Sequence, residues 1–392
     1  MVGCIQHFAQ TVVRCLFLWQ LALTVLTSAD RYPFFEEVYQ PENNLIKLKN
    51  MLLDQNTSAL YVGSVNHLYK LSPDLGIEAT IQTGPRQDYP GCIAPPVECD
   101  YETTTTDNIN KLLVIDQDRL FVCGSIYQGF CEIRRLSDLG LLGNDSYQEI
   151  AANTPDGTSV AFIAPGPLGT DVLYVGTSHG QWIDKAVPTV SSRVLQVENT
   201  GRDLFEILED ATNFLEAEIQ IPSDFITNNA FNIDYLYGFS NTKFSYFVAI
   251  QPKDPVAIQP TFYTKIARVC QQDIAYYSYI ELPLSCKQGD TDYNVAQSAY
   301  VATIGSALAS SSDFEVGEKV LFVTFSESRV DEITPTESSA ICMYSIKGIN
   351  EQFYNRRKEC ALGQTATTDI PWLRSTPCPS HDQNLVRFFI IY

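Results

Sequence analysis

The fold follows from one stretch of sequence, Leu120-Phe121-Val122-Cys123-Gly124-Ser125-Ile126-Tyr127-Gln128-Gly129-Phe130-Cys131-Glu132-Ile133. Two apolar runs flank a polar turn that contains glycine, which is the pattern of a β-hairpin. Residues 60–71 and residues 173–183 repeat this pattern. The turn glycines of the three copies lie 61 and 52 residues apart, at Gly63, Gly124 and Gly176. Repetition at about 50 residues is typical of a β-propeller, in which each unit is one four-stranded blade.

The composition agrees with an all-β protein and argues against some partners. The chain has 392 residues, of which 45% are hydrophobic, and its 21 Tyr and 21 Phe suit strands. The net charge of −20 argues against nucleic acid, because phosphates require a basic surface. No Gly/Ser-rich or Pro-rich linker is long enough to divide the chain, so we expect one domain.

The first 29 residues have the pattern of a secretory signal peptide. Arg14 is their only charge, Leu16 to Leu26 is an apolar run, and Thr27-Ser28-Ala29 offers small residues for cleavage before Asp30. The apolar run is too short to span a bilayer. We therefore expect residues 1–29 to be removed and the chain as written to be secreted.

Loss of that segment leaves nine cysteines, which an oxidising compartment makes candidates for disulfides before metal ligands. They are Cys92, Cys99, Cys123, Cys131, Cys270, Cys286, Cys342, Cys360 and Cys378. The central hairpin would bring Cys123 and Cys131 within disulfide range. No Cys-x-x-Cys pair occurs, so we expect neither zinc nor another cofactor. Asn56 and Asn144 begin Asn-x-Ser triplets and are predicted glycosylation sites.

The remaining segments are mostly predicted strands, with two predicted helices. Residues 202–218 fit a strand or a short helix. Asp292 to Ser310 is rich in alanine and predicts a helix, and Asn350 to Cys360 predicts a short polar helix whose basic run, 356–358, is a solvated face. The predicted strands are Phe231 to Phe239, Phe244 to Gln251, Phe262 to Tyr279, Val320 to Phe325 and Ala340 to Ile346.

One short motif suggests an enzyme. Gly176-Thr177-Ser178-His179-Gly180 matches the nucleophile elbow of the α/β-hydrolases, which requires a turn between a strand and a helix. Here Gln181-Trp182-Ile183 is instead predicted to be the returning strand of the third hairpin. We therefore expect a binding surface rather than an active site, with a propeller hydrolase acting through Ser178 as the less favoured alternative.

Several stretches resemble the extracellular sema domain of the plexins, over roughly residues 34 to 378. The matching stretches are residues 62–75 with Thr83-Gly84-Pro85, residues 106–113, residues 123–131, Ile221-Pro222-Ser223-Asp224, Lys265-Ile266-Ala267-Arg268-Val269-Cys270 and Pro371-Trp372-Leu373. The resemblance implies a seven-bladed propeller that binds a semaphorin and a parent guidance receptor at the plasma membrane, with receptor dimerisation passing the signal inward. It implies no small-molecule substrate.

The resemblance also implies a domain layout and a disulfide set. Residues 1–29 are the signal peptide, 30–380 a partial sema domain truncated to about five blades, and 381–392 a tail without a match. The implied disulfides are Cys92–Cys99, Cys123–Cys131, Cys286–Cys342 and Cys360–Cys378. In the family, the cysteine that matches Cys270 pairs with a cysteine just beyond the position of Cys378. This sequence has no cysteine after Cys378, so Cys270 is predicted to be unpaired here.

The predicted ligand contacts lie in residues 193–209 and are Arg193, Asp203 and Phe205. For Phe205 the alternative is a role in the core. The truncation is expected to reflect an incomplete gene model or a splice form. If the short form is real, a secreted decoy that binds semaphorin without signalling is the alternative function.

Overall fold

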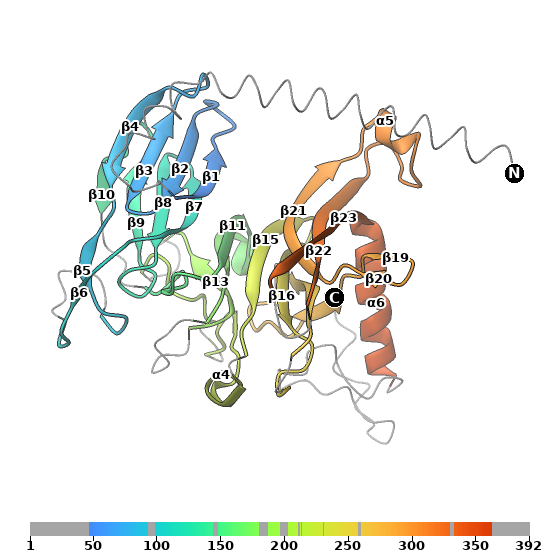
Figure 1. The fold of residues 1–392 in the computed structure, drawn as a ribbon. Coiled ribbons are helices and arrows are strands. Elements are labelled where there is room, and N and C mark those ends of the chain that lie inside the picture. The colour runs from blue at the N-terminus through green and yellow to red at the C-terminus, as the bar shows by residue number, and fades with distance from the viewer. Residues whose placement is uncertain are drawn as a thin grey trace, which may run out of the picture.

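The structure is a computed structural model in which the strands form a β-propeller of five blades (Figure 1). It describes residues 47–92, 99–143, 148–179, 187–196, 203–210, 212, 214–229, 231–257, 260–329 and 333–362. Four blades are four-stranded antiparallel sheets, and the fifth is three-stranded. The all-β propeller that the repeated hairpins predict is therefore confirmed.

Blades 1 and 2 contain the first two hairpin repeats. Blade 1 consists of β1 (Leu48–Leu53), β2 (Leu60–Ser64), β3 (His67–Leu71) and β4 (Ile77–Gln82). Blade 2 consists of β7 (Asn110–Asp116), β8 (Arg119–Gly124), β9 (Cys131–Arg135) and β10 (Leu141–Gly143). The repeats form the central hairpins β2–β3 and β8–β9, in which the apolar runs pair as expected.

Blades 3 and 4 follow the same strand order. Blade 3 consists of β11 (Ser159–Pro165), β12 (Asp171–Thr177), β13 (Val190–Val194) and β14 (Glu218–Ile219). Blade 4 consists of β15 (Asp234–Asn241), β16 (Phe244–Pro252), β17 (Phe262–Cys270) and β18 (Ile280–Pro283). The third repeat supplies β12, and the strand that returns beside it is β13. The predicted returning strand, residues 181–183, lies outside the described residues.

Blade 5 corrects one prediction and confirms another. It consists of β21 (Val295–Thr303), β22 (Lys319–Ser328) and β23 (Pro335–Ser345). The helix predicted for Asp292 to Ser310 is wrong, because this segment pairs with β22 as strand β21 and only α5 (Ser306–Ala309) is helical. Sheet pairing outweighs the helix propensity of alanine here. The second predicted helix is present as α6 (Ile346–Ala361).

Smaller elements connect the blades. A two-stranded sheet, β5 (Arg86–Asp88) and β6 (Thr104–Thr106), lies between blades 1 and 2, and another, β19 (Lys287–Gln288) and β20 (Thr291–Asp292), between blades 4 and 5. A 3-10 helix (Pro167–Gly169) connects β11 and β12, and helix α4 (Ser223–Asn229) connects blades 3 and 4.

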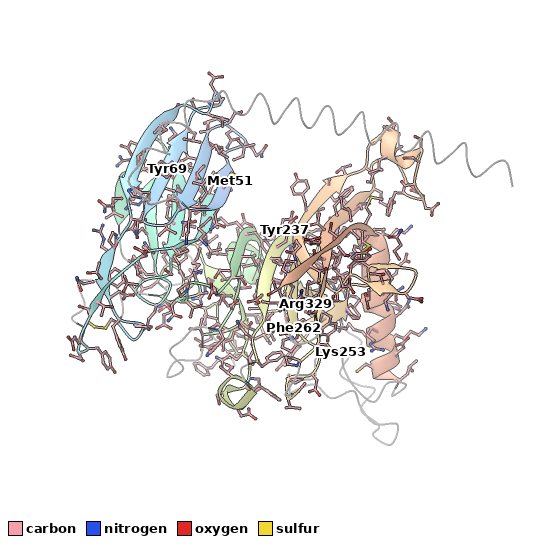
Figure 2. The ribbon with its side chains drawn as sticks, viewed as in Figure 1. Met51, Tyr69, Tyr237, Lys253, Phe262 and Arg329 are labelled. Carbon is pink, nitrogen blue, oxygen red and sulfur yellow. A yellow bond between two sulfur atoms is a disulfide. The ribbon has the colours of Figure 1, made fainter. Side chains whose placement is uncertain are left out.

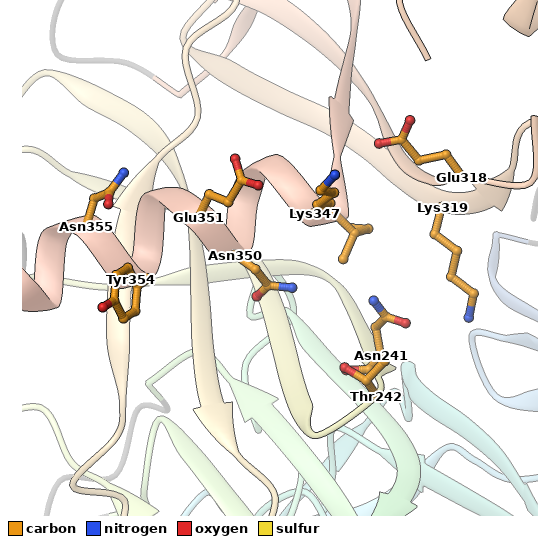
Figure 3. Close-up of a pocket in the computed structure, with 10 residues that line it drawn as sticks. Asn241, Thr242, Glu318, Lys319, Lys347, Asn350, Glu351, Tyr354 and Asn355 are labelled. Atoms are coloured by element: carbon orange, nitrogen blue, oxygen red, sulfur yellow. The ribbon is translucent and has the colours of Figure 1, made fainter. Parts of the chain in front are cut away.

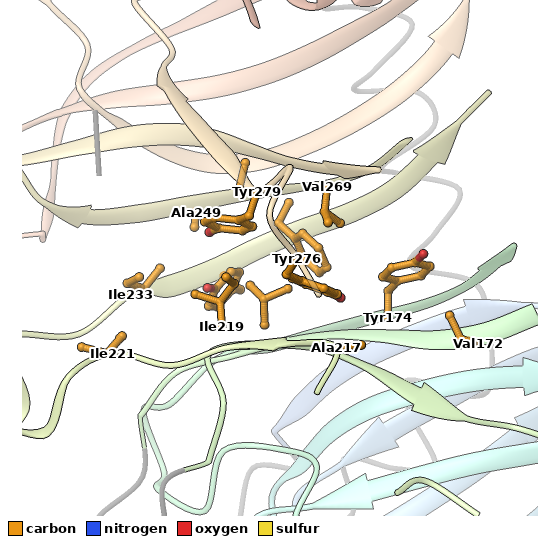
Figure 4. Close-up of a cluster of buried hydrophobic side chains, with 14 of the residues drawn as sticks. Val172, Tyr174, Ala217, Ile219, Ile221, Ile233, Ala249, Val269, Tyr276 and Tyr279 are labelled. Atoms are coloured by element: carbon orange, nitrogen blue, oxygen red, sulfur yellow. The ribbon is translucent and has the colours of Figure 1, made fainter. Parts of the chain in front are cut away.

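The hydrophobic core consists of layers between successive blades. The first strands of the blades, β1, β7, β11, β15 and β21, contact one another in that order and form the inner ring. Between blades 3 and 4, Tyr174 of β12 packs in one cluster with Val269 of β17 and with Tyr276 (Figure 4). Because neighbouring blades share each layer, the blades form one continuous core.

The three repeat glycines lie inside strands β2, β8 and β12, which corrects their assignment to turns. A Cβ atom at Gly63 would overlap the side chain of Asn110 on blade 2. At Gly176 it would lie 2.7 Å from the ring of Tyr235 on blade 4. These glycines therefore permit close approach of the next blade, for which a side chain leaves no room.

Gly63→Ala should lower the free energy of unfolding by about 1–3 kcal/mol, because the new methyl group overlaps Asn110. Asn110 is buried, and its Oδ1 accepts a hydrogen bond of 2.8 Å from Asn50 Nδ2, so it cannot move aside without loss. Urea denaturation measures the change. Gly305→Ala is the control, because a Cβ atom there has no neighbour within 4 Å. Equal stability of both variants would contradict tight packing at Gly63.

Candidate binding surface

Residues 203–210 extend blade 3 beside strand β13. Phe205 N–H donates to the Val194 carbonyl at 2.8 Å, and Leu208 N–H donates to the Ser192 carbonyl at 2.9 Å. Ile207 forms a β-bridge with Arg193. The segment therefore runs along β13 in an extended arrangement, although Phe205 itself has a positive φ of 68°.

Two of the three predicted contact residues, Arg193 and Phe205, are buried. Phe205 is 0% exposed, and its ring meets that of Phe121 edge to face at 4.8 Å. Arg193 is 2% exposed; its Nη1 donates to the Phe205 carbonyl at 3.0 Å and its Nε to Ser191 Oγ at 3.1 Å. Burial lowers the pKa of Arg193 to about 10. The prediction that these two residues contact a ligand directly is therefore corrected, because a protein ligand cannot reach buried side chains.

The third residue, Asp203, is exposed and belongs to an acidic surface. We call this surface the acidic rim, and it comprises Asp203, Glu206, Glu209, Asp210 and Glu216. Asp203 N–H donates to Glu206 Oε2 at 3.1 Å, and a β-bridge joins Glu209 to Glu216. Beside the rim, burial and the neighbouring Glu216 raise the pKa of Glu218 to about 7. To the acidic residues of the predicted range 193–209 the structure adds Asp210 and Glu216, which lie beyond it in the sequence.

Ser178, the candidate nucleophile of the hydrolase alternative, is 1% exposed. Its Oγ accepts from Thr158 N–H at 3.0 Å and lies 3.0 Å from the Ile233 carbonyl and 3.1 Å from Asp234 Oδ1. Thr158 belongs to the start of blade 3, and Asp234 begins blade 4. The serine therefore joins two blades, in a position that a substrate cannot reach.

The structure contains disulfides Cys92–Cys99, Cys123–Cys131 and Cys286–Cys342. Cys360 is also disulfide-bonded, while Cys378 lies outside the described residues. Cys270 has a free thiol. Of the predicted glycosylation sites, Asn56 is exposed in the turn after β1, and Asn144 lies outside the described residues, as do residues 1–29 and 381–392.

Among the described residues, no three or more His, Cys, Asp or Glu side chains are grouped so that they could hold a metal ion. Nor does any described helix have the length and apolar character needed to cross a membrane.

Comparison with known proteins identifies the relatives of this chain. A family model of the Sema domain matches residues 296–387. Human plexin-A4 is 33% identical over 350 residues, which are 84% of this chain and 18% of that protein. Mouse plexin-A2 is 33% identical over 377 residues, 93% of this chain and 20% of that protein. The chain thus spans about a fifth of the length of the curated relatives it matches.

Solved structures agree with these sequence matches. The extracellular region of plexin A4 superimposes with a TM-score of 0.75 at 32% identity, covering 85% of this chain and 38% of that one. Drosophila Semaphorin 2a, at 17% identity and a TM-score of 0.51 over 79% of this chain and 49% of that one, shares the fold alone. Together with the five blades, these similarities define the chain as a sema-domain β-propeller. The sequence identity makes it a sema domain of the plexin type.

Proposed function

We propose that this chain binds a semaphorin outside the cell and that it catalyses no reaction. The observation that carries the proposal is the match to plexins over 84–93% of the chain, together with the plexin A4 fold. Within the plexins, the sema domain is the extracellular ligand-binding module. The burial of Ser178 further disfavours the hydrolase alternative.

The acidic rim is the surface that we propose contacts the semaphorin. A concentration of carboxylates steers a partner with a basic surface and raises the rate of association. In this proposal Arg193 and Phe205 act indirectly, because they hold the backbone that presents Asp203. The contact residues themselves are Asp203, Glu206 and Glu216.

Asp203→Lys combined with Glu206→Lys should slow semaphorin association about tenfold, because charges at the edge of an interface act mainly on the association rate. Surface plasmon resonance with a panel of purified semaphorin ectodomains measures the rate at two salt concentrations. The matched control is Asp313→Lys with Glu337→Lys, two exposed acids on blade 5 whose reversal changes the net charge equally.

Two outcomes would contradict different parts of this proposal. If both double variants slow association equally, the effect is one of net charge and the acidic rim is not the contact surface. If the unmodified chain binds none of the semaphorins, the proposed function itself is wrong. The second result does not depend on where the contact lies.

We further propose that the chain enters the secretory pathway. Disulfides are typical of oxidising compartments, and residues 1–29 have the pattern of a signal peptide. Expression in cultured cells distinguishes a secreted decoy from a part of a membrane-bound receptor. Recovery from the medium as a semaphorin-binding protein supports the secreted decoy, and recovery only as part of a longer membrane-bound chain supports the receptor. Dimer formation by the receptor stays a prediction.

A further inference from the structure

A groove lies between helix α6 and two hairpin turns of blades 4 and 5, and it is not part of the acidic rim. Its volume is about 740 Å³, and we call it the α6 groove. Figure 3 shows Lys347, Asn350 and Tyr354 on the helix. The facing turns supply Asn241 and Lys319 (Figure 3).

A buried cation lies beneath the floor of the α6 groove. Arg268 is 5% exposed, and its guanidinium is held between the rings of Phe244, at 4.1 Å, and Phe353, at 4.4 Å. No carboxylate of the described residues forms an ion pair with it. Burying a charge without a counter-ion is costly, and burial lowers the pKa of Arg268 to about 10. The floor therefore carries a positive potential that an anion in the groove would neutralise.

Asn350 connects this cation to the α6 groove. Its Oδ1 accepts hydrogen bonds from Arg268 Nη1 at 2.8 Å and from Tyr246 O–H at 2.7 Å. Two donors require the amide oxygen on that side, so the orientation of the amide is fixed. The Nδ2 group consequently presents its N–H donors on the groove side, where Asn350 lines the floor.

The other lining groups add donors and positive charge. Lys319 and Lys347 are exposed, and neither forms an ion pair within the described residues. Two lining carboxylates, Glu318 and Glu351, offset the charge of the two lysines, and Glu318 already accepts from Glu315 N–H at 3.0 Å and contacts Ser345 Oγ. The excess positive charge of the groove is therefore that of Arg268 beneath its floor, on a chain whose net charge is −20.

We propose that the α6 groove binds a sulfated polysaccharide chain. Sulfate groups supply both the negative charge that Arg268 lacks and the acceptors that Asn350, Lys319 and Lys347 require. The Tyr354 ring, 66% exposed beside the groove, offers a flat face on which a sugar ring can stack. The open form of the groove suits an extended polymer. The acidity of the rest of the surface confines such a polyanion to this place.

The first test is Asn350→Asp, measured with a heparin-derived octasaccharide by isothermal titration calorimetry on the full chain. The new carboxylate retains both hydrogen bonds, gives Arg268 its counter-ion and repels sulfate. Affinity should therefore fall at least tenfold while the melting temperature stays equal or rises. A lost affinity accompanied by a lower melting temperature would overturn the assignment, because it would report damage to α6 and not electrostatic exclusion.

The second test removes the two lysines. Lys319→Ser combined with Lys347→Ser should weaken octasaccharide binding at least tenfold. The matched control, Lys49→Ser with Lys253→Ser, makes the same change in net charge and should alter affinity less than twofold. Lys49 belongs to β1 of blade 1. Lys253 follows the C-terminal end of β16, whereas the groove lies at the N-terminal end of that strand, beside the β15–β16 turn (Figure 2). Equal losses in both double variants would overturn the proposal.

Three further results decide the chemistry of the ligand. Failure of the unmodified chain to bind the octasaccharide would overturn the proposal outright. Equal binding after chemical removal of the sulfates would show that the charge of the α6 groove is not used. Tighter binding of an aspartate decapeptide than of the octasaccharide would replace the polysaccharide by an acidic peptide. None of these measurements involves semaphorin, so each outcome is independent of the proposed function.

Discussion

Glu281→Ala should lower the free energy of unfolding by about 3–5 kcal/mol, because it leaves the ammonium of Lys265 buried without its counter-ion. The two side chains are 2% and 1% exposed, and Lys265 Nζ lies 2.7 Å from Glu281 Oε2. Gln251 Nε2, at 2.9 Å, and Tyr279 O–H, at 2.8 Å, also donate to this carboxylate. Burial alone would lower the pKa of Lys265, but the neighbouring carboxylate raises it above its ordinary value. Urea denaturation at neutral pH, followed by fluorescence, measures the loss.

An exposed ion pair of the same kind provides the control. Lys287 and Asp292 lie 3.3 Å apart with side chains 58% and 53% exposed, so Asp292→Ala should cost no more than about 1 kcal/mol. Replacing both buried partners, as Lys265→Met with Glu281→Leu, should recover part of the stability, since no charge is left buried although Gln251 and Tyr279 lose a shared acceptor. A cost for Glu281→Ala as small as that for Asp292→Ala would show that water reaches the pair.

Local patterns in the sequence were sufficient to predict the blades. In each of the hairpins at residues 60–71 and 120–133, two apolar runs lie within a few residues of one another in the sequence, and a β-hairpin depends on such neighbouring runs and on the turn between them. The same reasoning assigned Gly63 to a turn, because glycine is common in turns. Its actual role depends on Asn110, a residue of the next blade, and a contact between blades cannot be derived from a local pattern.

The sites were less predictable because they depend on which residues the fold brings together. Arg193 was expected at the surface, where arginine is usually found, but the backbone turn at Phe205 offers its guanidinium an interior carbonyl. Lys265 and Glu281 meet only because the register of β17 and β18 pairs Glu281 with Ala267. The α6 groove likewise requires the docking of a helix, and the polar pattern of residues 350–360 predicts the helix without predicting where it lies.

Arg268→Lys should release helix α6 from the propeller and cost about 2–4 kcal/mol, because two desolvated cation–π contacts are weakened together. The guanidinium is flat and stacks between Phe244 of β16 and Phe353 of α6 while it donates to Asn350. A lysine ammonium is compact and cannot stack on both rings and keep that hydrogen bond. Hydrogen exchange of the α6 amides, read by mass spectrometry, measures the release, and urea denaturation measures the cost.

The matched control for this substitution is Arg357→Lys, since Arg357 is an exposed arginine on the same helix. It should leave both the exchange rates of α6 and the free energy of unfolding within about 0.5 kcal/mol of the original chain. Unchanged protection of α6 in Arg268→Lys would show that the buried face of the helix, with Ile349 and Phe353, is sufficient to dock it. Arg268 would then be retained for its charge alone, which is the property that the α6 groove requires.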